Sequence, residues 1–373
     1  MRSIPNIYIL GVKELWSLWR DPIMLFLIVY TFTVAIYIAA TAMPDSLNKA
    51  SLAIVDEDGS PLSERIISAF YPPYFMPPKI ISLTAVDPGM DSGDYTFTLD
   101  IPPNFQRNVS AGNSPTIQLN VDATRMSQAF TGSGYIQQII LEEINEFVQR
   151  YRGVVIPAVD IVLRARFNPN LTQSWFGSVM ELVNHVAMVS IILSGAALIR
   201  EREHGTIEHL LVMPVTPAEI MIAKIWSMGL VVLLATMCSL IFVIKGALHV
   251  PIEGSITLFL VGVILHLFAT TSMGIFMGCM ARSMPQFGLL IVLVLLPLEM
   301  LSGGVTPRES MPILAQNVML VTPNTHFVSA AQAILFRSAG FDVVWPQFLA
   351  LIMIGTLFFV ITLGRFRKTT SRI

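Results

Sequence analysis

The residues best able to do chemistry lie in one stretch, 200–220, where charge is dense although the flanking sequence is apolar. His204, Glu208 and His209 are residue types that bind zinc, so a metal site is one interpretation. The two histidines are five residues apart, however, which places them on different faces of a helix, and Gly205 intervenes. The His-Glu-x-x-His pattern of zinc enzymes is absent. We therefore expect no metal site here.

The same stretch is better suited to docking against another protein. Gly205 allows a turn, and Thr206 is a suitable N-cap for a short helix over 207–213. Pro214 and Pro217 would end that helix and begin another. The prediction is a short helix parallel to the membrane that presents its charges to a soluble partner. An ordinary solvated turn is the alternative.

Other chemistries find little support in the sequence. No Gly-x-x-x-x-Gly-Lys-Ser/Thr run is present, so we expect the chain to bind no cofactor and to hydrolyse no ATP. Ser194-Gly195 lacks the Gly-x-Ser-x-Gly pattern of hydrolases. Cys238 and Cys279 lie in apolar runs and are predicted to be packing residues rather than a disulfide or metal ligands.

The elements that must position these residues are membrane helices. Apolar residues make up 54% of the chain, charged residues 13%, and the mean hydropathy is +0.66, whereas soluble proteins have about 25% charged residues. Six apolar runs are long enough, or nearly so, to cross a bilayer as helices. They are Ile23–Ala42, Trp175–Ile199, Trp226–Leu248, Ile256–Met280, Phe287–Leu301 and Phe348–Gly364.

The distribution of Lys and Arg in the short loops predicts the orientation of these spans. Most of these residues lie on the side of the chain termini, which the positive-inside rule assigns to the cytoplasm. That side has Arg2, Lys13, Arg20, Arg200, Arg202, Lys224, Arg282, Arg365, Arg367, Lys368 and Arg372, and the other has Lys245, Arg308 and Arg337. We therefore expect a multi-pass protein of the inner membrane with both termini cytoplasmic.

Residues 43–174 differ from the spans and are predicted to form a periplasmic domain. Strands are expected at 51–55, 95–101 and 116–121, by alternation in the last two. Helices are expected at 61–70, 104–111 and 126–151, the last with apolar residues three and four apart. The predicted fold class is mostly α: a polytopic helical membrane protein with six transmembrane helices and an inserted α/β extracytoplasmic domain. The first transmembrane helix covers 23–42, and the other five lie in 175–373.

Residues 1–22 are predicted to include an amphipathic helix in the membrane interface. Its apolar face has Tyr8, Val12, Leu15, Trp16 and Trp19, and its polar face has Lys13, Glu14, Ser17 and Arg20. A water-exposed extension of the first span is the alternative. Asp21-Pro22 disfavours it, because proline disfavours helical geometry in the residue before it and suits the start of a new helix.

Ionisable residues inside spans are costly and mark candidate substrate paths. Glu181, Asn184 and His185 share one face of the second span, where they either line such a path or subunit seam or form a satisfied cluster at the outer interface. Glu299 follows Pro297 in the fifth span and is a candidate gate, or a residue with a partner in the next segment.

Two further features concern packing and the later loops. Residues 302–345, which begin with Ser302 and Gly303, are predicted to contain a re-entrant region. Gly274 and Gly278 form a small-xxx-small pattern in the fourth span. This pattern allows close helix contact, either within one subunit or across a dimer.

Several motifs together resemble the type-2 permeases of ATP-binding-cassette (ABC) exporters. The first is Glu201-Arg202-Glu203-x-Gly205-Thr206-x-Glu208-x-Leu210, followed by Pro214-x-x-Pro217. Lys13-Glu14 with Arg20-Asp21-Pro22 resembles the N-terminal connecting helix of that family. Leu301-Ser302-Gly303-Gly304 resembles its segment between spans five and six. The resemblance covers nearly the whole chain, and a large external domain is typical of the bacterial drug-efflux-like branch.

The resemblance implies a permease subunit that forms the path of a lipophilic or drug-like substrate out of the cell. Two permeases would pair, as a homodimer or with a homologue, and each would bind a cytoplasmic ABC ATPase subunit that uses ATP. Residues 201–217 would contain the coupling helix, and a periplasmic adaptor is a further partner in this branch. The alternatives are a membrane-embedded enzyme, an ion-coupled secondary transporter and a receptor. No catalytic constellation or inverted repeat supports the first two, and receptors seldom need six spans.

Overall fold

The chain divides into two units of structure, and each is described by itself. A computed structural model describes residues 3–42, 49–122, 126–152, 172–203, 215–304, 306 and 308–370. The helical unit comprises Met1–Met43 and Arg166–Ile373, and the insert unit comprises Pro44–Ala165.

The helical unit is built from helices long and apolar enough to cross a membrane. Six candidate spans are found in the described part of the chain, which confirms the number predicted. Their elements are α2 (Pro22–Tyr30) continued by a π-helical turn at Thr31–Ala35 and by α3 (Ile36–Ala42), α8 (Gln173–Glu203), α10 (Pro217–Cys238) continued by a π-helical segment at Ser239–Ala247, α11 (Ile256–Met280), α12 (Met284–Leu301) and α15 (Phe341–Thr370).

Capping residues explain where two of these spans begin. The Asp21 side chain accepts a hydrogen bond from the Met24 amide at 3.1 Å, and Pro22 occupies the first turn of α2. The new helix predicted after Asp21-Pro22 is therefore present. Thr216 and Glu219 form a capping box at the start of α10. Because this cap lies upstream of the predicted start at Trp226, the third span is longer than predicted.

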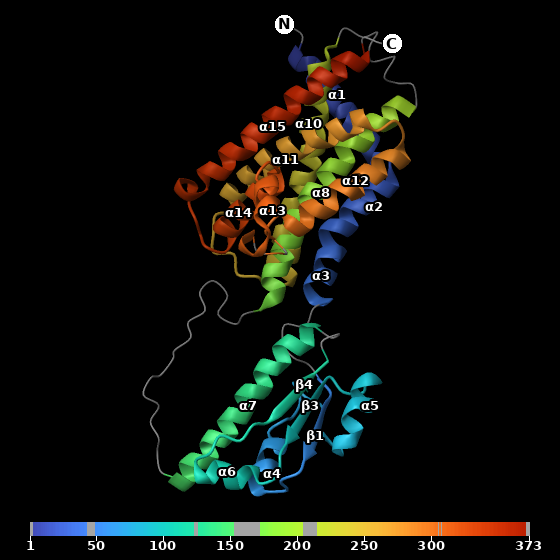
Figure 1. Cartoon of the computed structure of the whole chain (residues 1–373). Helices are drawn as coiled ribbons and strands as arrows, with labels where there is room; N and C mark the ends of the chain where they lie inside the picture. Colours follow the sequence, from blue (N-terminus) through green and yellow to red (C-terminus); the bar gives the residue numbers. More distant parts are fainter. Residues whose placement is uncertain are drawn as a thin grey trace. The chain divides into compact units, whose positions relative to one another are not determined.

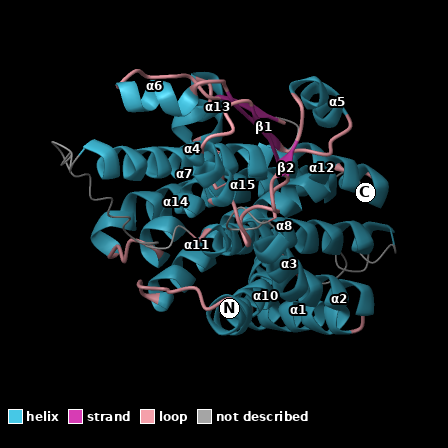
Figure 2. Cartoon of the chain, turned by 90° about the horizontal axis from the view of Figure 1, so that it is seen from below, coloured by secondary structure: helices cyan, strands magenta, loops and turns pink. Residues whose placement is uncertain are grey.

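Two central helices organise the helical unit. Over its most apolar window α8 is 83% buried and α11 is 67% buried, whereas α12 is only 17% buried. α11 packs against both α8 and α15. Figure 2 shows α1 (Ser3–Trp19), α2 and α10 grouped beside one another, and these helices are in contact. The apolar faces that the outer helices leave exposed are suited to lipid.

Small residues allow α8 and α11 to approach closely. A Cβ atom at Gly278 would lie 3.0 Å from the carbonyl oxygen of Gly195, and one at Gly274 would overlap Ser194 and the backbone of Ile191. The small-xxx-small pattern predicted in the fourth span therefore packs within the subunit. Nearby, the Ser190 hydroxyl donates a hydrogen bond to Thr270 at 2.7 Å.

The segment between α12 and α15 contains two helices that the sequence did not predict. After a 3-10 turn at Arg308–Ser310 come α13 (Ile313–Met319) and α14 (Pro323–Leu335). α14 packs against α8, α11, α12 and α15, and most of its side chains are buried. Figure 1 shows α13 and α14 at the end of the helical unit away from the chain termini. A re-entrant position of this segment in a bilayer stays a prediction.

The insert unit contains a mixed four-stranded sheet with strand order β2-β1-β3-β4. Its strands are β1 (Leu52–Asp56), β2 (Lys79–Ile80), β3 (Phe97–Ile101) and β4 (Gln118–Val121). β1 is parallel to β2 and β3, and β4 is antiparallel to β3. β1, β3 and β4 overlap the predicted strands, whereas β2 was not predicted.

Helices pack on both faces of this sheet (Figure 1). The core contains Phe97 and Leu99 of β3 together with residues of α4 (Pro61–Ser68), α6 (Phe105–Ala111) and α7 (Met126–Arg152). Alternate residues of β3 point the other way, so the Thr98 hydroxyl lies 3.5 Å from the sulfur of Met90 in α5 (Val86–Asp91). α4, α6 and α7 overlap predicted helices, and α5 was not predicted.

Candidate functional site

The N-terminal helix α1 is held tightly against α10. The Trp226 indole donates a hydrogen bond to the carbonyl of Ile7 at 3.2 Å and stacks on the Tyr8 ring with a centroid separation of 6.2 Å. Gly11 lies against the same indole, and a Cβ atom there would overlap it. The contact therefore requires glycine at position 11, because any side chain would push α1 away from α10.

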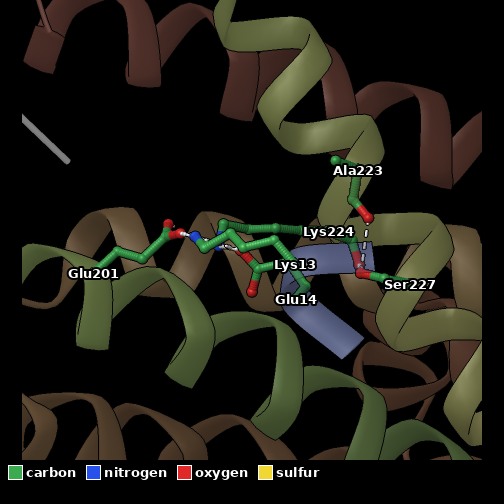
Figure 3. A network of polar contacts seen from close by, with 6 residues as sticks. All are labelled: Lys13, Glu14, Glu201, Ala223, Lys224 and Ser227. Atoms are coloured by element: carbon green, nitrogen blue, oxygen red, sulfur yellow. Dashed lines mark hydrogen bonds and ion pairs between the residues drawn. The ribbon is translucent and has the colours of Figure 1, made fainter. Parts of the chain in front are cut away.

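This packing brings four charged side chains into one cluster, shown in Figure 3. The Lys224 ammonium of α10 lies 2.9 Å from Glu14 Oε1 and 2.7 Å from Glu201 Oε2. Lys13 pairs with the same two carboxylates, at 3.2 Å from Glu14 Oε1 and in direct contact with Glu201. We call Lys13, Glu14, Glu201 and Lys224 the ion cluster; it joins α1, the last turn of α8 and α10.

The ion cluster is electrically balanced and mostly buried. Lys224 is 1% exposed, Glu14 6% and Glu201 8%, whereas the Lys13 side chain is 46% exposed. Burial on its own lowers the pKa of the Lys13 ammonium, but Glu201 and Glu14 outweigh burial and the pKa lies above its ordinary value. Buried charges are tolerated only when they are paired and hydrogen-bonded. The two ammonium groups and the two carboxylates of the cluster therefore make each other's burial tolerable.

Further polar contacts tie down the same end of α8. Arg200 pairs with Asp21 at the start of α2. Arg202 donates a hydrogen bond to the carbonyl of Ala281 at 2.6 Å, just beyond α11. The Glu203 carboxylate accepts one from the Met284 amide at 3.0 Å, where α12 begins. Together with the ion cluster, these contacts link the last turn of α8 to five neighbouring elements: α1, α2, α10, α11 and α12.

The arrangement can transmit force because of where it lies in the chain. Glu201 closely precedes residues 204–214, and Lys224 follows them within the first turns of α10. Both helices that flank this segment are therefore tied to α1. Gly205, Thr206, Glu208, Leu210 and Pro214, predicted to take part in ATPase coupling, lie outside the described residues.

α1 is a helix where the interfacial helix was predicted, and its position in the membrane interface stays a prediction; its polar face does not face water alone. Glu14 points into the protein, and the face of α1 that packs inward also includes Leu10, Gly11 and Leu18. Tyr8, Trp16 and Trp19, three residues of the predicted apolar face, are exposed by 60–71%. The remaining polar residues are exposed: these are Lys13, Ser17 and Arg20. The reason is the ion cluster, which satisfies Glu14 inside the protein.

The candidate path residues in the spans form two groups. On α8, His185 Nδ1 lies 4.0 Å from Glu181 Oε2, and Asn184 on the same helix is buried. Glu299 of α12 is close enough to Glu181 to interact with it electrostatically. The structure thus brings Glu299 of the fifth span near Glu181 of the second span, and Glu181 lies one turn from His185.

The second group lines a cavity of about 660 Å³. Ser302 and Gly303, predicted as part of a path or gate, are among its lining residues. Gly303 has a φ of +97°, which favours glycine, and its position directly after α12 allows the chain to turn there. Pro297 lies inside α12, upstream of the cavity.

Sequence reasoning missed several residues that the structure brings into these sites. Lys224 was assigned to a loop, whereas it lies inside α10, where its ammonium contacts both carboxylates of the ion cluster. The Thr216-x-x-Glu219 capping pattern before an apolar run would have placed it two turns inside a helix. Arg308 and Arg337 also line the cavity. No sequence pattern pointed to these arginines or to Trp226, because their roles depend on distant elements.

A metal site finds no support among the residues that the structure describes. No group of three His, Cys, Asp or Glu side chains in that part of the chain could hold an ion. His204, Glu208 and His209, the only set considered from the sequence, lie outside it. The free thiols of Cys238 and Cys279 form no disulfide.

Comparison with known proteins agrees with these features. A family model described as ABC-2 family transporter protein matches residues 22–363. The chain is 63% identical over 369 residues to "Inner membrane transport permease YhhJ" of Escherichia coli K12, covering 99% of both chains. It is 26% identical over 348 residues to "Probable multidrug ABC transporter permease YbhR" of the same organism, covering 92% of this chain and 93% of the relative.

Proposed function

The chain belongs to the ABC-2 family of transporter proteins and is a permease, and from this premise we propose how it works and what it carries. It forms the substrate path of an ABC exporter and couples that path to a separate cytoplasmic ATPase subunit. The exported molecule is lipophilic or drug-like, as the name of the relative YbhR suggests.

The ion cluster is the observation that carries the proposed coupling mechanism. The coupling helix within residues 201–217 docks on the ATPase and receives its movement when ATP is bound and hydrolysed. Residues 204–214 of this segment connect α8 to α10 in the chain. Because Lys224 contacts both Glu14 and Glu201, displacement of that segment moves α8, α10 and α1 together. The pairing of Arg200 with Asp21 extends the same displacement to α2.

The proposed orientation places both termini and residues 204–214 in the cytoplasm and the insert unit in the periplasm. The excess of Lys and Arg in the loops on the side of the termini supports it. Single-cysteine labelling tests it in a background without Cys238 and Cys279. A membrane-impermeant maleimide added to intact spheroplasts is expected to label Ser68→Cys in α4 but not Ser17→Cys in α1. Labelling of Ser17→Cys but not of Ser68→Cys would show that the orientation is the opposite of the proposed one.

Further partners follow from the same proposal. A second permease copy or a paired homologue completes the path, and the insert unit docks a periplasmic adaptor. Crosslinking from exposed positions of residues 60–120 tests the adaptor. If no periplasmic protein is captured from cells that carry out efflux, the proposal of an adaptor is contradicted.

The coupling role of residues 204–214 is tested by Glu208→Lys and Gly205→Pro. The chain is purified with its ATPase subunit and reconstituted, and ATP hydrolysis is compared with that of the ATPase alone. Both variants are expected to insert normally but to lose stimulation of ATP hydrolysis and efflux from cells. Glu253→Lys, which makes the same charge change at an exposed position outside this segment, is the control. Normal efflux in both coupling variants would contradict the proposal.

A further inference from the structure

The cavity that contains Ser302 and Gly303 lies at the end of the spans remote from the ion cluster. Phe176, in the first turn of α8, lines it, whereas Glu201 lies in the last turn of the same helix. At about 1.5 Å per residue these positions are roughly 37 Å apart along the helix. The volume of about 660 Å³ is within the range of small-molecule sites. The cavity is therefore large enough to hold a ligand and is separate from the coupling end.

Positive charge is concentrated in this cavity. Arg308 and Arg337 both line it, and none of the lining side chains that the structure describes is acidic. Neither guanidinium forms an ion pair with any side chain in the described ranges. Two arginines without a carboxylate between them favour an anion, because a guanidinium binds phosphate, sulfate or carboxylate through two parallel hydrogen bonds.

Two amide side chains that line the same cavity, Gln332 and Gln347, are incompletely hydrogen-bonded. The Oε1 atom of Gln347 is buried and has no hydrogen-bond partner among the described residues. The Nε2 atom of Gln332 makes only long contacts, at 3.4 Å to the Gly303 carbonyl and 3.5 Å to the Met180 sulfur. A buried polar atom without a partner is costly. The Gln332 amide nitrogen can donate to an anionic oxygen of a ligand, whereas Gln347 Oε1 can only accept and would need an O–H or N–H group of the ligand.

The remaining lining is mixed: Thr325, His326 and Ser329 are polar, and one part of the wall is apolar. Phe176, Val328 and Pro346 contribute to the wall, and the Phe176 ring is stacked on Phe336 with a centroid separation of 5.7 Å. An inorganic anion would gain nothing from these residues. A molecule with an apolar part would gain about 25 cal/mol for each Å² of apolar surface that it buries.

We propose that this cavity binds an amphiphile with an anionic headgroup. The headgroup pairs with Arg308 and Arg337, and the apolar part lies against Phe176, Val328 and Pro346. Its identity as the exported substrate at the outer end of the path rests on the proposed function. The binding itself does not depend on that function.

Binding is tested on the full-length chain in dodecyl maltoside by native mass spectrometry with dodecyl phosphate as the probe. Loss of one charge-assisted contact weakens such binding about tenfold. Arg308→Gln and Arg337→Gln are therefore each expected to raise the dissociation constant about tenfold, and the double variant further. Lys245→Gln removes a positive charge from the outer end of the third span but outside the cavity, and is expected to bind normally. Arg337→Lys keeps the positive charge at this position. Comparison of this variant with Arg337→Gln separates a loss of binding from a loss of folding.

Competition experiments then identify the source of the headgroup. Displacement of dodecyl phosphate by phosphatidylglycerol but not by phosphatidylcholine would assign the site to an anionic lipid. Displacement by neither, with binding still dependent on both arginines, would assign it to a non-lipid amphiphile. Displacement by equal concentrations of inorganic phosphate, or equal binding to the wild type and the double variant, would overturn the proposal.

A separate readout distinguishes this inference from the proposed function. In the complex with its ATPase, dodecyl phosphate is expected to change ATP hydrolysis in the wild type and not in the Arg308/Arg337 double variant. Binding without any effect on ATP hydrolysis would leave the anion site intact and contradict its place in the transport path. If dodecyl phosphate does not bind but coupling through residues 204–214 is normal, the anion site is overturned and the proposed function is not.

Discussion

Replacement of Lys224 by methionine is the sharpest test of the ion cluster. The substitution keeps the length and apolar stem of the side chain but removes an ammonium that is 1% exposed. Two carboxylates, at 2.9 and 2.7 Å, lose their buried partner and keep only Lys13. We therefore expect a large loss of stability in the helical unit.

The magnitude follows from burial. Two unit charges about 3 Å apart interact by roughly 5–6 kcal/mol at an effective dielectric constant of 20. Desolvation offsets much of this, and breaking a buried pair by removing one partner costs about 3–5 kcal/mol. Lys13 contacts the same carboxylates, but its side chain is 46% exposed, so screening by water reduces its contribution to about 1 kcal/mol or less.

The assay is equilibrium unfolding of the full chain in mixed dodecyl maltoside and SDS micelles. Lys224→Met is expected to lower the free energy of unfolding by about 3–5 kcal/mol, and the control Lys13→Met by about 1 kcal/mol or less. Combining Lys224→Met with Glu14→Gln leaves one balanced pair, so the double variant should be more stable than Lys224→Met alone. Equal losses for the two lysine variants would refute the argument, and so would a double variant whose losses simply add.

Three other substitutions and one control test the packing and the helix cap that support the cluster and the central helices. Gly11→Val should separate α1 from the Trp226 indole and lower the free energy of unfolding by about 1–3 kcal/mol in the same assay. Gly274→Val should do the same for α8 and α11, whereas Gly364→Val, where no atom lies within 4 Å, should change it by about 0.5 kcal/mol or less. Thr216→Ala removes the cap of α10 and should cost about 1 kcal/mol; no change would indicate that the cap is dispensable.

Local patterns account for what the sequence could predict. The six spans are recognisable because each needs about 20 apolar residues, a signal that does not depend on tertiary contacts. The strands and long helix of the insert unit follow from alternation and from apolar residues three and four apart. β2 is only two residues long and α5 only six, too short to produce a period. α14 was missed because its Pro-rich flanks resemble a loop.

The functional contacts could not be predicted in the same way. Glu14 and Lys224 look like solvated charges in sequence, because nothing local indicates that another helix will cover them. Their burial depends on Gly11, which lets α1 approach Trp226 closely enough for Lys224 to reach Glu14. The cavity likewise joins elements from the second span to the last. Sequence identified Ser302 and Gly303 there but gave no reason to connect them with Arg337.

The ion cluster adds charged contacts to the apolar ones, such as those of Leu10, Leu198 and Ile220, that join α1, α8 and α10, and these charges fit the proposed coupling. Apolar packing could supply comparable stability, since replacing a buried ion pair by well-packed apolar residues is often neutral or stabilising. Apolar surfaces can slide past each other at small cost, however, whereas a hydrogen-bonded ammonium loses its partner within about 1 Å of movement. Any sliding of α8 against α10 would separate Lys224 from Glu201 or Glu14. The ion cluster therefore favours movement of the three helices as one body, which is what an exporter needs if force enters between α8 and α10.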